Sequence, residues 1–162
     1  MEDSSAELLG SRSDCIDCVH QLILGASQEV YVYSQILESE LYNHRPLYDH
    51  LVKLATTIRN SDIRILCHDT RRAAYNGHYF IHLCQKLPTF ASIRTSIIPS
   101  HRKFRESWLM TDASGYMRIR NPQRYEGYFE LDNKLECRTY RDQFLEAWEA
   151  CEQDQNTRRL SL

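Results

Sequence analysis

The chain has 162 residues, enough for one domain with a substantial core, and its 42% hydrophobic and 26% charged residues form a globular rather than a disordered composition. Its formal net charge of −2 gives no global positive field that would attract nucleic acid or a membrane surface, so any basic site must be local. No apolar run approaches the roughly 20 residues of a membrane span, and the polar, acidic start lacks the pattern of a secretory signal. We therefore expect a cytoplasmic protein.

The first element that the sequence predicts is a helix that follows a polar N-terminus. Residues 1–13 are rich in serine and acidic side chains, and we expect them to be flexible, ahead of a single domain over residues 14–162. From Asp14 onward, apolar residues follow helical spacing until Gly25, a residue type that commonly ends helices. The β-branched and aromatic run over residues 29–34 then predicts the first strand.

Two further alternations of helix and strand come next. Pro46 suits the first turn of a second helix, and residues 62–67 predict a second strand. Asp69 or Thr70 is placed to cap a third helix, which Pro88 would end.

The remaining chain predicts a run of strands and a last helix. Strands are expected at residues 91–98, 106–112, 116–120 and 127–131. Asn133 and Glu136 form a capping-box pattern that opens the last helix. The order α-β-α-β-α-β-β-β-β-α predicts an α/β domain with a mixed β-sheet and helices on both faces.

The six cysteines favour packing over chemistry. In a cytoplasmic chain of this size we expect them to be reduced and buried. Cys15 and Cys18 lie on the apolar stripe of the first helix, and no second Cys/His pair at zinc-finger spacing accompanies them. The sequence also has no Gly-rich phosphate loop, Ser-His-Asp pattern or His-Glu-x-x-His zinc helix. We therefore expect neither a metal nor a cofactor.

Three segments together resemble the first βαβ unit of the phospholipase-D-like superfamily: residues 30–34, 47–51 and 63–66. More narrowly, the chain resembles an uncharacterised proteobacterial domain of this class that is often found C-terminal to GNAT-type acetyltransferase domains. The residues that carry this second resemblance are 37–42, 64–69, Gly77-His78 and 124–127. The resemblance covers about residues 13–160 and implies a single phospholipase-D-like half that pairs as a homodimer.

The resemblance also implies a catalytic motif to look for. Active members of the superfamily carry His-x-Lys-x4-Asp followed by Gly-Ser-x-Asn, and two such motifs meet in one site. One histidine attacks phosphorus, the other protonates the leaving oxygen, and the lysines hold the phosphate charge. In this chain His101 and Lys103 match the first two elements, but the acidic position falls on Trp108.

The register can instead be anchored on Asp112. Arg105 and Ser107 then stand where the motif has histidine and lysine, and Gly-Ser-x-Asn is absent downstream. We therefore expect a domain that is catalytically inactive. The alternative is a homodimeric phosphodiesterase or nuclease that uses His101 and Lys103.

Basic residues concentrate in one part of the sequence: His101, Arg102, Lys103, Arg105, Arg118, Arg120 and Arg124. Arg118 and Arg120 are two residues apart on a predicted strand, so we expect them to share a face. There they could hold a phosphate or carboxylate through bidentate contacts. The alternative is a solvated strand edge that its charges protect against aggregation.

Three other motifs have both a structural and a functional interpretation. Asp69 and Arg71 follow a strand, where ligands often bind in α/β sheets, although Asp69 is also an ordinary helix cap. Gly77 and His78 are expected inside the third helix, where they favour close packing and a buried hydrogen bond over catalysis. Residues 124–127 are expected to form a structural ion pair with a turn glycine, or a binding rim.

Taken together, the sequence predicts an inactive phospholipase-D-like domain that binds an anionic or phosphate-containing ligand, or a protein partner, through residues 101–124. A regulatory module for an acetyltransferase is a second alternative, and nucleic acid is not excluded as a ligand. The expected ligand-binding residues are Arg105, Asp112, Arg118, Arg120, Arg124, Asp69 and Arg71.

Overall fold

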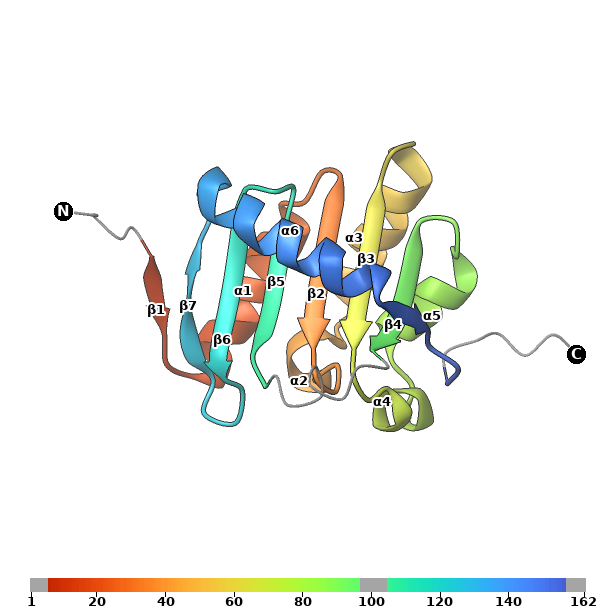
Figure 1. The fold of residues 1–162 in the computed structure, drawn as a ribbon, viewed down its shortest axis with the longest axis horizontal. Coiled ribbons are helices and arrows are strands. Elements are labelled where there is room, and N and C mark those ends of the chain that lie inside the picture. Colours follow the sequence, from red (N-terminus) through yellow and green to blue (C-terminus); the bar gives the residue numbers. More distant parts are fainter. Residues whose placement is uncertain (1–5, 97–104, 157–162) are drawn as a thin grey trace, which may run out of the picture.

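A single mixed sheet organises the computed structural model, which describes residues 6–96 and 105–156 (Figure 1). Its strand order is β1-β7-β6-β5-β2-β3-β4-β8. The strands β2, β3 and β4 run parallel, and all other neighbouring strands pair antiparallel. The strands are β1 (Glu7–Leu9), β2 (Glu29–Ser34), β3 (Asp62–Cys67), β4 (Ala91–Ser96), β5 (Ser107–Thr111), β6 (Gly115–Asn121), β7 (Glu126–Glu130) and β8 (Cys151–Gln153).

Helices cover both faces of this sheet, as the sequence predicted. The helices are α1 (Arg12–Leu24), α2 (Ser39–Tyr42), α3 (Arg45–Thr57), α4 (Arg71–Asn76), α5 (Tyr79–Lys86) and α6 (Lys134–Glu149). In Figure 1, α1, α3 and α5 lie behind the sheet and α6 crosses its front. No helix in the described part of the chain is long and apolar enough to span a bilayer.

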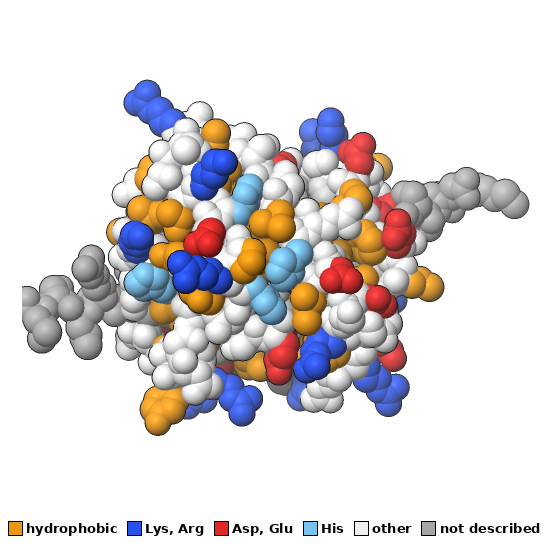
Figure 2. Space-filling view, turned by 180° about the vertical axis from the view of Figure 1, so that it is seen from behind, with side chains coloured by type: hydrophobic (Ala, Val, Ile, Leu, Met, Phe, Trp, Pro, Cys, Tyr) orange, Lys and Arg blue, Asp and Glu red, His pale blue; other side chains and the backbone are white. Residues whose placement is uncertain are grey.

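Side-chain alternation in β2 divides the interior into two cores. Val30 and Val32 pack with the helices behind the sheet, whereas Tyr31 and Tyr33 pack with α6. The α6 side is strongly aromatic, and Phe144 stacks on Tyr31 with ring centroids 4.9 Å apart. Figure 2 shows the molecule from the side of α1, α3 and α5, where histidine side chains lie among hydrophobic patches.

Two short strands were not predicted. Glu7–Leu9 lies within the N-terminal stretch that the sequence suggested was flexible, yet it pairs with β7 as an edge strand. The helix α1 also begins earlier than expected, because the Ser11 hydroxyl accepts a hydrogen bond from the Asp14 amide. At the other edge, β8 pairs with β4. Strands of three residues are too short to show an alternating pattern, so no periodicity predicted them.

The predicted third helix is wrong, because the structure has two helices there. Gly77 has a φ of +81°, which ends α4, and His78 caps α5 by accepting a hydrogen bond from the Phe80 amide through Nδ1. Asn43 accepts from the Tyr79 amide and so ties this break to α2. Gly77 therefore interrupts the helical spacing that the apolar residues on either side of it maintain.

The antiparallel β5 brings distant segments to one end of the sheet. Tyr33, near the end of β2, pairs with Trp108, near the start of β5. The carboxyl ends of β2, β3, β4 and β6 therefore lie at the same end as the start of β5, together with α2 and α4 (Figure 1). We call this end the carboxyl edge and the opposite end the amino edge.

Candidate functional site

The carboxyl edge is the candidate site, because ligands of α/β sheets bind beyond the carboxyl ends of parallel strands. Two hollows open there, of about 500 Å³ and about 310 Å³. The first is lined by Gln35, Ile36, His68, Asp69, Thr70, Arg71, Thr95, Asp154 and Asn156. The second lies between α2 and α4 and is lined in part by Glu38, Glu40, Arg72 and Asn76.

Asp112 lies at the amino edge, away from the arginines with which the sequence grouped it. Its carboxylate accepts hydrogen bonds from the amides of Ser27 (2.9 Å), Gln28 (2.8 Å) and Glu29 (2.9 Å). The Ser27 hydroxyl adds a further bond at 3.2 Å. These contacts hold the end of β5 against the α1–β2 connection. The role of Asp112 is therefore structural.

Ser107, at the position of the motif lysine in this register, is fully buried at the start of β5. Its hydroxyl donates to Glu38 Oε1 at 3.0 Å, and the Ser34 hydroxyl donates to Oε2 at 2.5 Å. The amide of Leu37 donates to the Ser34 hydroxyl oxygen, and Leu37 lies in the left-handed region at φ 57°. A small neutral side chain bound to a carboxylate thus occupies this position at the start of β5.

Arg105, at the position of the motif histidine, is exposed. His101, Arg102 and Lys103 lie outside the described residues. The described residues nearest to them in the sequence are Ser96 and Arg105, both at the carboxyl edge.

Two polar groups of the larger hollow were not predicted. His68, directly after β3, is buried with Nε2 only 2.7 Å from the Tyr33 hydroxyl. Asp154 is 3% exposed, and its carboxylate accepts from the hydroxyls of Thr70 (2.8 Å) and Thr95 (2.7 Å). His68 could have been found as a polar residue ending a buried strand, whereas Asp154 depends on the unpredicted β8.

Asp69 and Arg71 form an exposed pair at the rim of that hollow. Asp69 accepts from the Arg71 amide at 3.0 Å, but the N-cap residue of α4 is Thr70. The Arg71 guanidinium reaches the same carboxylate through Nε (3.0 Å) and Nη2 (2.8 Å). Hydrogen bonding to Asp69 raises the pKa of Arg71, so this side chain stays cationic.

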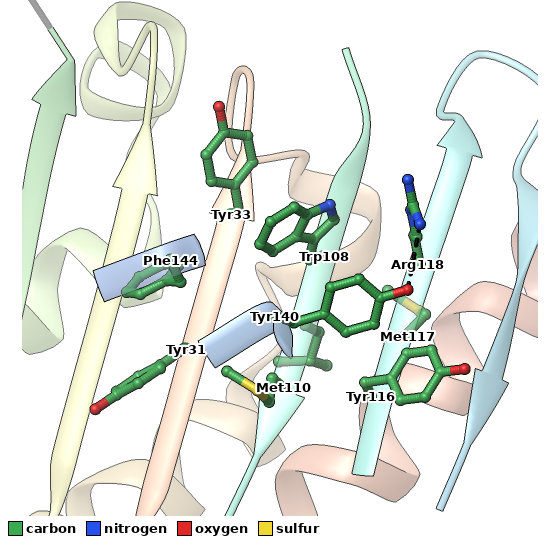
Figure 3. Close-up of a pocket in the computed structure, with 10 residues that line it drawn as sticks. Tyr31, Tyr33, Trp108, Met110, Tyr116, Met117, Arg118, Tyr140 and Phe144 are labelled. Atoms are coloured by element: carbon green, nitrogen blue, oxygen red, sulfur yellow. Dashed lines mark hydrogen bonds between the residues drawn. The ribbon is translucent and has the colours of Figure 1, made fainter. Parts of the chain in front are cut away.

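Arg118 is held in the α6-side core rather than left open to a ligand. Its Nε donates to Glu106 at 2.7 Å, and its Nη1 lies 3.2 Å from the hydroxyls of both Tyr128 and Tyr140. Figure 3 shows its guanidinium directed at Tyr140 beside Trp108 and Tyr116. Burial opposes the charge on Arg118, but the hydrogen bonds to Glu106 and Tyr140 raise its pKa overall.

Arg120 and Arg124 remain exposed at the carboxyl edge. Arg120 lies over the Tyr128 ring at 5.3 Å, so both arginines of β6 reach that tyrosine, as the sequence predicted for side chains that share a face. Arg124 sits in the β6–β7 turn and forms no ion pair with Glu126, both of which are described. The Cys15 thiol donates to the Tyr125 carbonyl at 3.4 Å and ties this turn to α1.

Within the described ranges, no group of three or more His, Cys, Asp or Glu side chains could hold a metal ion. All six cysteines are buried free thiols, which confirms that Cys15 and Cys18 pack in the core of α1.

Several solved structures share this fold. TrmBL2, an archaeal chromatin protein whose structure shows a novel mode of DNA binding, is 14% identical with a TM-score of 0.66 over 95% of this chain. The chain spans only 56% of that protein's length. Nuc from Salmonella typhimurium, a phospholipase D family member, is 10% identical with a TM-score of 0.64, and 93% of this chain covers 97% of that one.

NucT from Helicobacter pylori gives a TM-score of 0.62 at 12% identity, over 93% of this chain and 99% of that one. At these identities the likeness establishes the fold, which is phospholipase-D-like, as the sequence implied. No curated protein matches the sequence. Residues 11–160 match one protein family, and the chain accordingly belongs to the family described as a domain of unknown function, DUF7931.

Proposed function

We propose that this chain is a non-catalytic phospholipase-D-like domain that binds an anionic, phosphate-containing ligand at its carboxyl edge. The observation that carries the proposal is the register of β5, with Asp112 fixed at one end. Counted back from Asp112 in the spacing of the motif, Arg105 and Ser107 correspond to the catalytic histidine and lysine. A guanidinium stays protonated and cannot act as a nucleophile, and the Ser107 hydroxyl is buried against Glu38.

The binding half of the proposal rests on exposed arginines. Arg105, Arg120 and Arg124 are exposed at the carboxyl edge, and none of them forms an ion pair within the described part of the chain. Arginine suits phosphate because its planar fork offers paired donors and its charge is permanent. Arg118 is already paired with Glu106, and Arg71 with Asp69. We therefore assign these two arginines a structural role at the carboxyl edge rather than ligand binding.

Binding is tested with fluorescein-labelled inorganic polyphosphate, which carries phosphate groups and no other recognition element. We expect the affinity to fall at least about tenfold in Arg105→Glu/Arg124→Glu, since each reversal removes and repels charge contacts. Arg59→Glu is the matched control, because Arg59 is exposed and precedes β3 at the amino edge. Equal losses in the two variants, or no binding by the natural chain, would contradict the proposal.

Catalysis is tested with bis-p-nitrophenyl phosphate. We expect the natural chain and His101→Ala to show the same background rate. Hydrolysis that disappears in His101→Ala would instead establish the phosphodiesterase alternative with His101 and Lys103.

The resemblance to single phospholipase-D-like halves supports two partners. We propose a homodimer, which sedimentation velocity would reveal as a species of twice the chain mass. Association with an acetyltransferase is a separate proposal, and co-purification from the native host tests it.

A further inference from the structure

Arg120 occupies a special place in β6, because it is the extra residue of a β-bulge. Ile119 pairs with Gly127 and Asn121 pairs with Glu126, so two steps along β6 match one step along β7. Bulges re-aim a side chain out of the regular alternation. Here the bulge leaves Arg120 exposed with its guanidinium over the Tyr128 ring, 5.3 Å from the centroid.

Gly127 makes this arrangement possible. A Cβ atom at residue 127 would lie 2.1 Å from the Arg118 carbonyl oxygen and 2.8 Å from the Ile119 Cα. The two backbones can therefore approach this closely only because Gly127 has no side chain. The same approach holds Tyr128, the next residue, directly beside β6.

Tyr128 is itself fixed from the other side. Its hydroxyl lies 3.2 Å from Arg118 Nη1 and 3.4 Å from the Tyr140 hydroxyl. The opposite residue on β1 is Leu8, which is 87% exposed. Opposed residues of an antiparallel pair point to the same face, so an apolar side chain lies next to the stack.

This combination suits a planar anion better than a bare phosphate. Phosphate needs donors and charge, which Arg105 and Arg124 supply. The Arg120 guanidinium lies 5.3 Å from the Tyr128 ring centroid and is exposed, and arginine planes stack on nucleobases. A neighbouring apolar surface adds contact area for a ring, whereas it contributes nothing to phosphate. Only unpaired strands offer free base faces, since duplex bases stack on one another.

We propose that the anionic ligand of the carboxyl edge is single-stranded nucleic acid, one base of which stacks on the Arg120 guanidinium while Tyr128 holds that guanidinium flat. The phosphates on either side would contact Arg105 and Arg124. This inference rests on the proposed function, because it names the ligand class of the same site. Arg120 is then a ligand contact, and Tyr128 is a positioning residue.

The test compares two fluorescein-labelled probes by anisotropy: an oligothymidylate and an abasic strand with the same number of phosphates. The natural chain is expected to bind the oligothymidylate more tightly. Arg120→Lys keeps the charge but loses the flat face, so it should bind the oligothymidylate about tenfold more weakly and the abasic strand unchanged, the size expected for one stacked base. Tyr128→Leu should show the same pattern.

Tyr128→Phe is the matched control, because it keeps the ring beneath Arg120 and loses only the hydroxyl. It should retain the preference for bases, with thermal unfolding confirming that every variant is folded. Equal binding of both probes by the natural chain, or no change in Arg120→Lys, would overturn the base stack and leave phosphate binding standing. Competition by a duplex as strong as by the single strand would also overturn it. Failure to bind either probe would reject both this inference and the proposed function.

Discussion

At one end of β5, the Asp112 carboxylate binds three successive backbone amides, whereas at the other end Ser107 is buried against Glu38 and Arg105 is exposed. Both ends belong to one stretch that resembles a catalytic motif. The acidic position acts on the protein's own backbone, so the fold needs it even when no reaction takes place. Under the proposed function no reaction needs the two basic positions, so they are free to change. The comparison suggests that scaffold and chemistry are separable parts of this motif.

The largest effect should come from the close approach that builds the carboxyl edge. Gly127→Ala places a methyl group against the Arg118 carbonyl, so β6 and β7 must separate, at a cost of about 3 kcal/mol. The fall in the free energy of unfolding is measured by urea denaturation. Gly10→Ala is the control, because nothing lies within 4 Å of a Cβ there, and it should leave stability nearly unchanged. Similar stabilities of the two variants would show that the edge is looser than the structure indicates.

Acid should weaken the carboxyl edge through His78, at the break between α4 and α5. Burial, with the nearby His44, lowers the pKa of His78 to about 4, below its value of about 6.5 in an unfolded chain. The unfolded state therefore binds the proton first, and stability is lost as the pH falls from about 6.5 toward 4, by about 2.5 kcal/mol at pH ~4.5. Urea unfolding at both ends of that range measures it. His78→Asn keeps an acceptor for the Phe80 amide and should flatten the slope; an unchanged slope would assign the effect elsewhere.

Removing the anchor at the amino edge should cost somewhat less. Asp112→Ala deletes hydrogen bonds to three amides and one hydroxyl in a half-exposed position, and we expect a loss of about 2 kcal/mol. The same measurement on Asp142→Ala, an exposed position on α6, gives the baseline for losing an aspartate. A small loss at Asp112 would mean that the register of β5 is set by something other than this carboxylate.

The smallest change is expected at the other end of the strand. Ser107→Ala removes one of the two hydroxyls that bind Glu38, at a cost of about 1 kcal/mol. Polyphosphate binding should be retained, because Ser107 is buried and contacts no ligand in the proposed site. If binding falls with little change in stability, Ser107 shapes the site more directly than the contrast between the two ends suggests.

Periodic patterns predicted most of this fold, and contacts between distant segments explain what they missed. The valines and tyrosines of β2 alternate between two cores, so the strand and both covering layers followed from the sequence. Gly77 was hidden by apolar residues on either side that kept helical spacing. The bulge at Arg120 left no local signal, because it exists only in the pairing of β6 with β7.

The candidate site was predictable to a similar degree. The sequence alone grouped the arginines of residues 105–124, but it could not show which of them are already bound to other side chains. Arg118 is bound to Glu106 and to two tyrosines from other elements. The contact of Glu38 with Ser107 and that of Thr70 with Asp154 join residues far apart in the chain. Such contacts depend on the order of the strands in the sheet, and that order cannot be derived from composition.

The short strand β1 has a practical consequence for anyone who handles this protein. Glu7–Leu9 closes the flank of β7, the strand that presents Tyr128. Proteolytic trimming to Asp14 would strip that cover and leave an open strand beside the aromatic ring, a surface prone to self-association. Preparations in which the N-terminus is partly trimmed would then differ in both aggregation and ligand affinity. The intact mass of each preparation should therefore be measured before its ligand affinity.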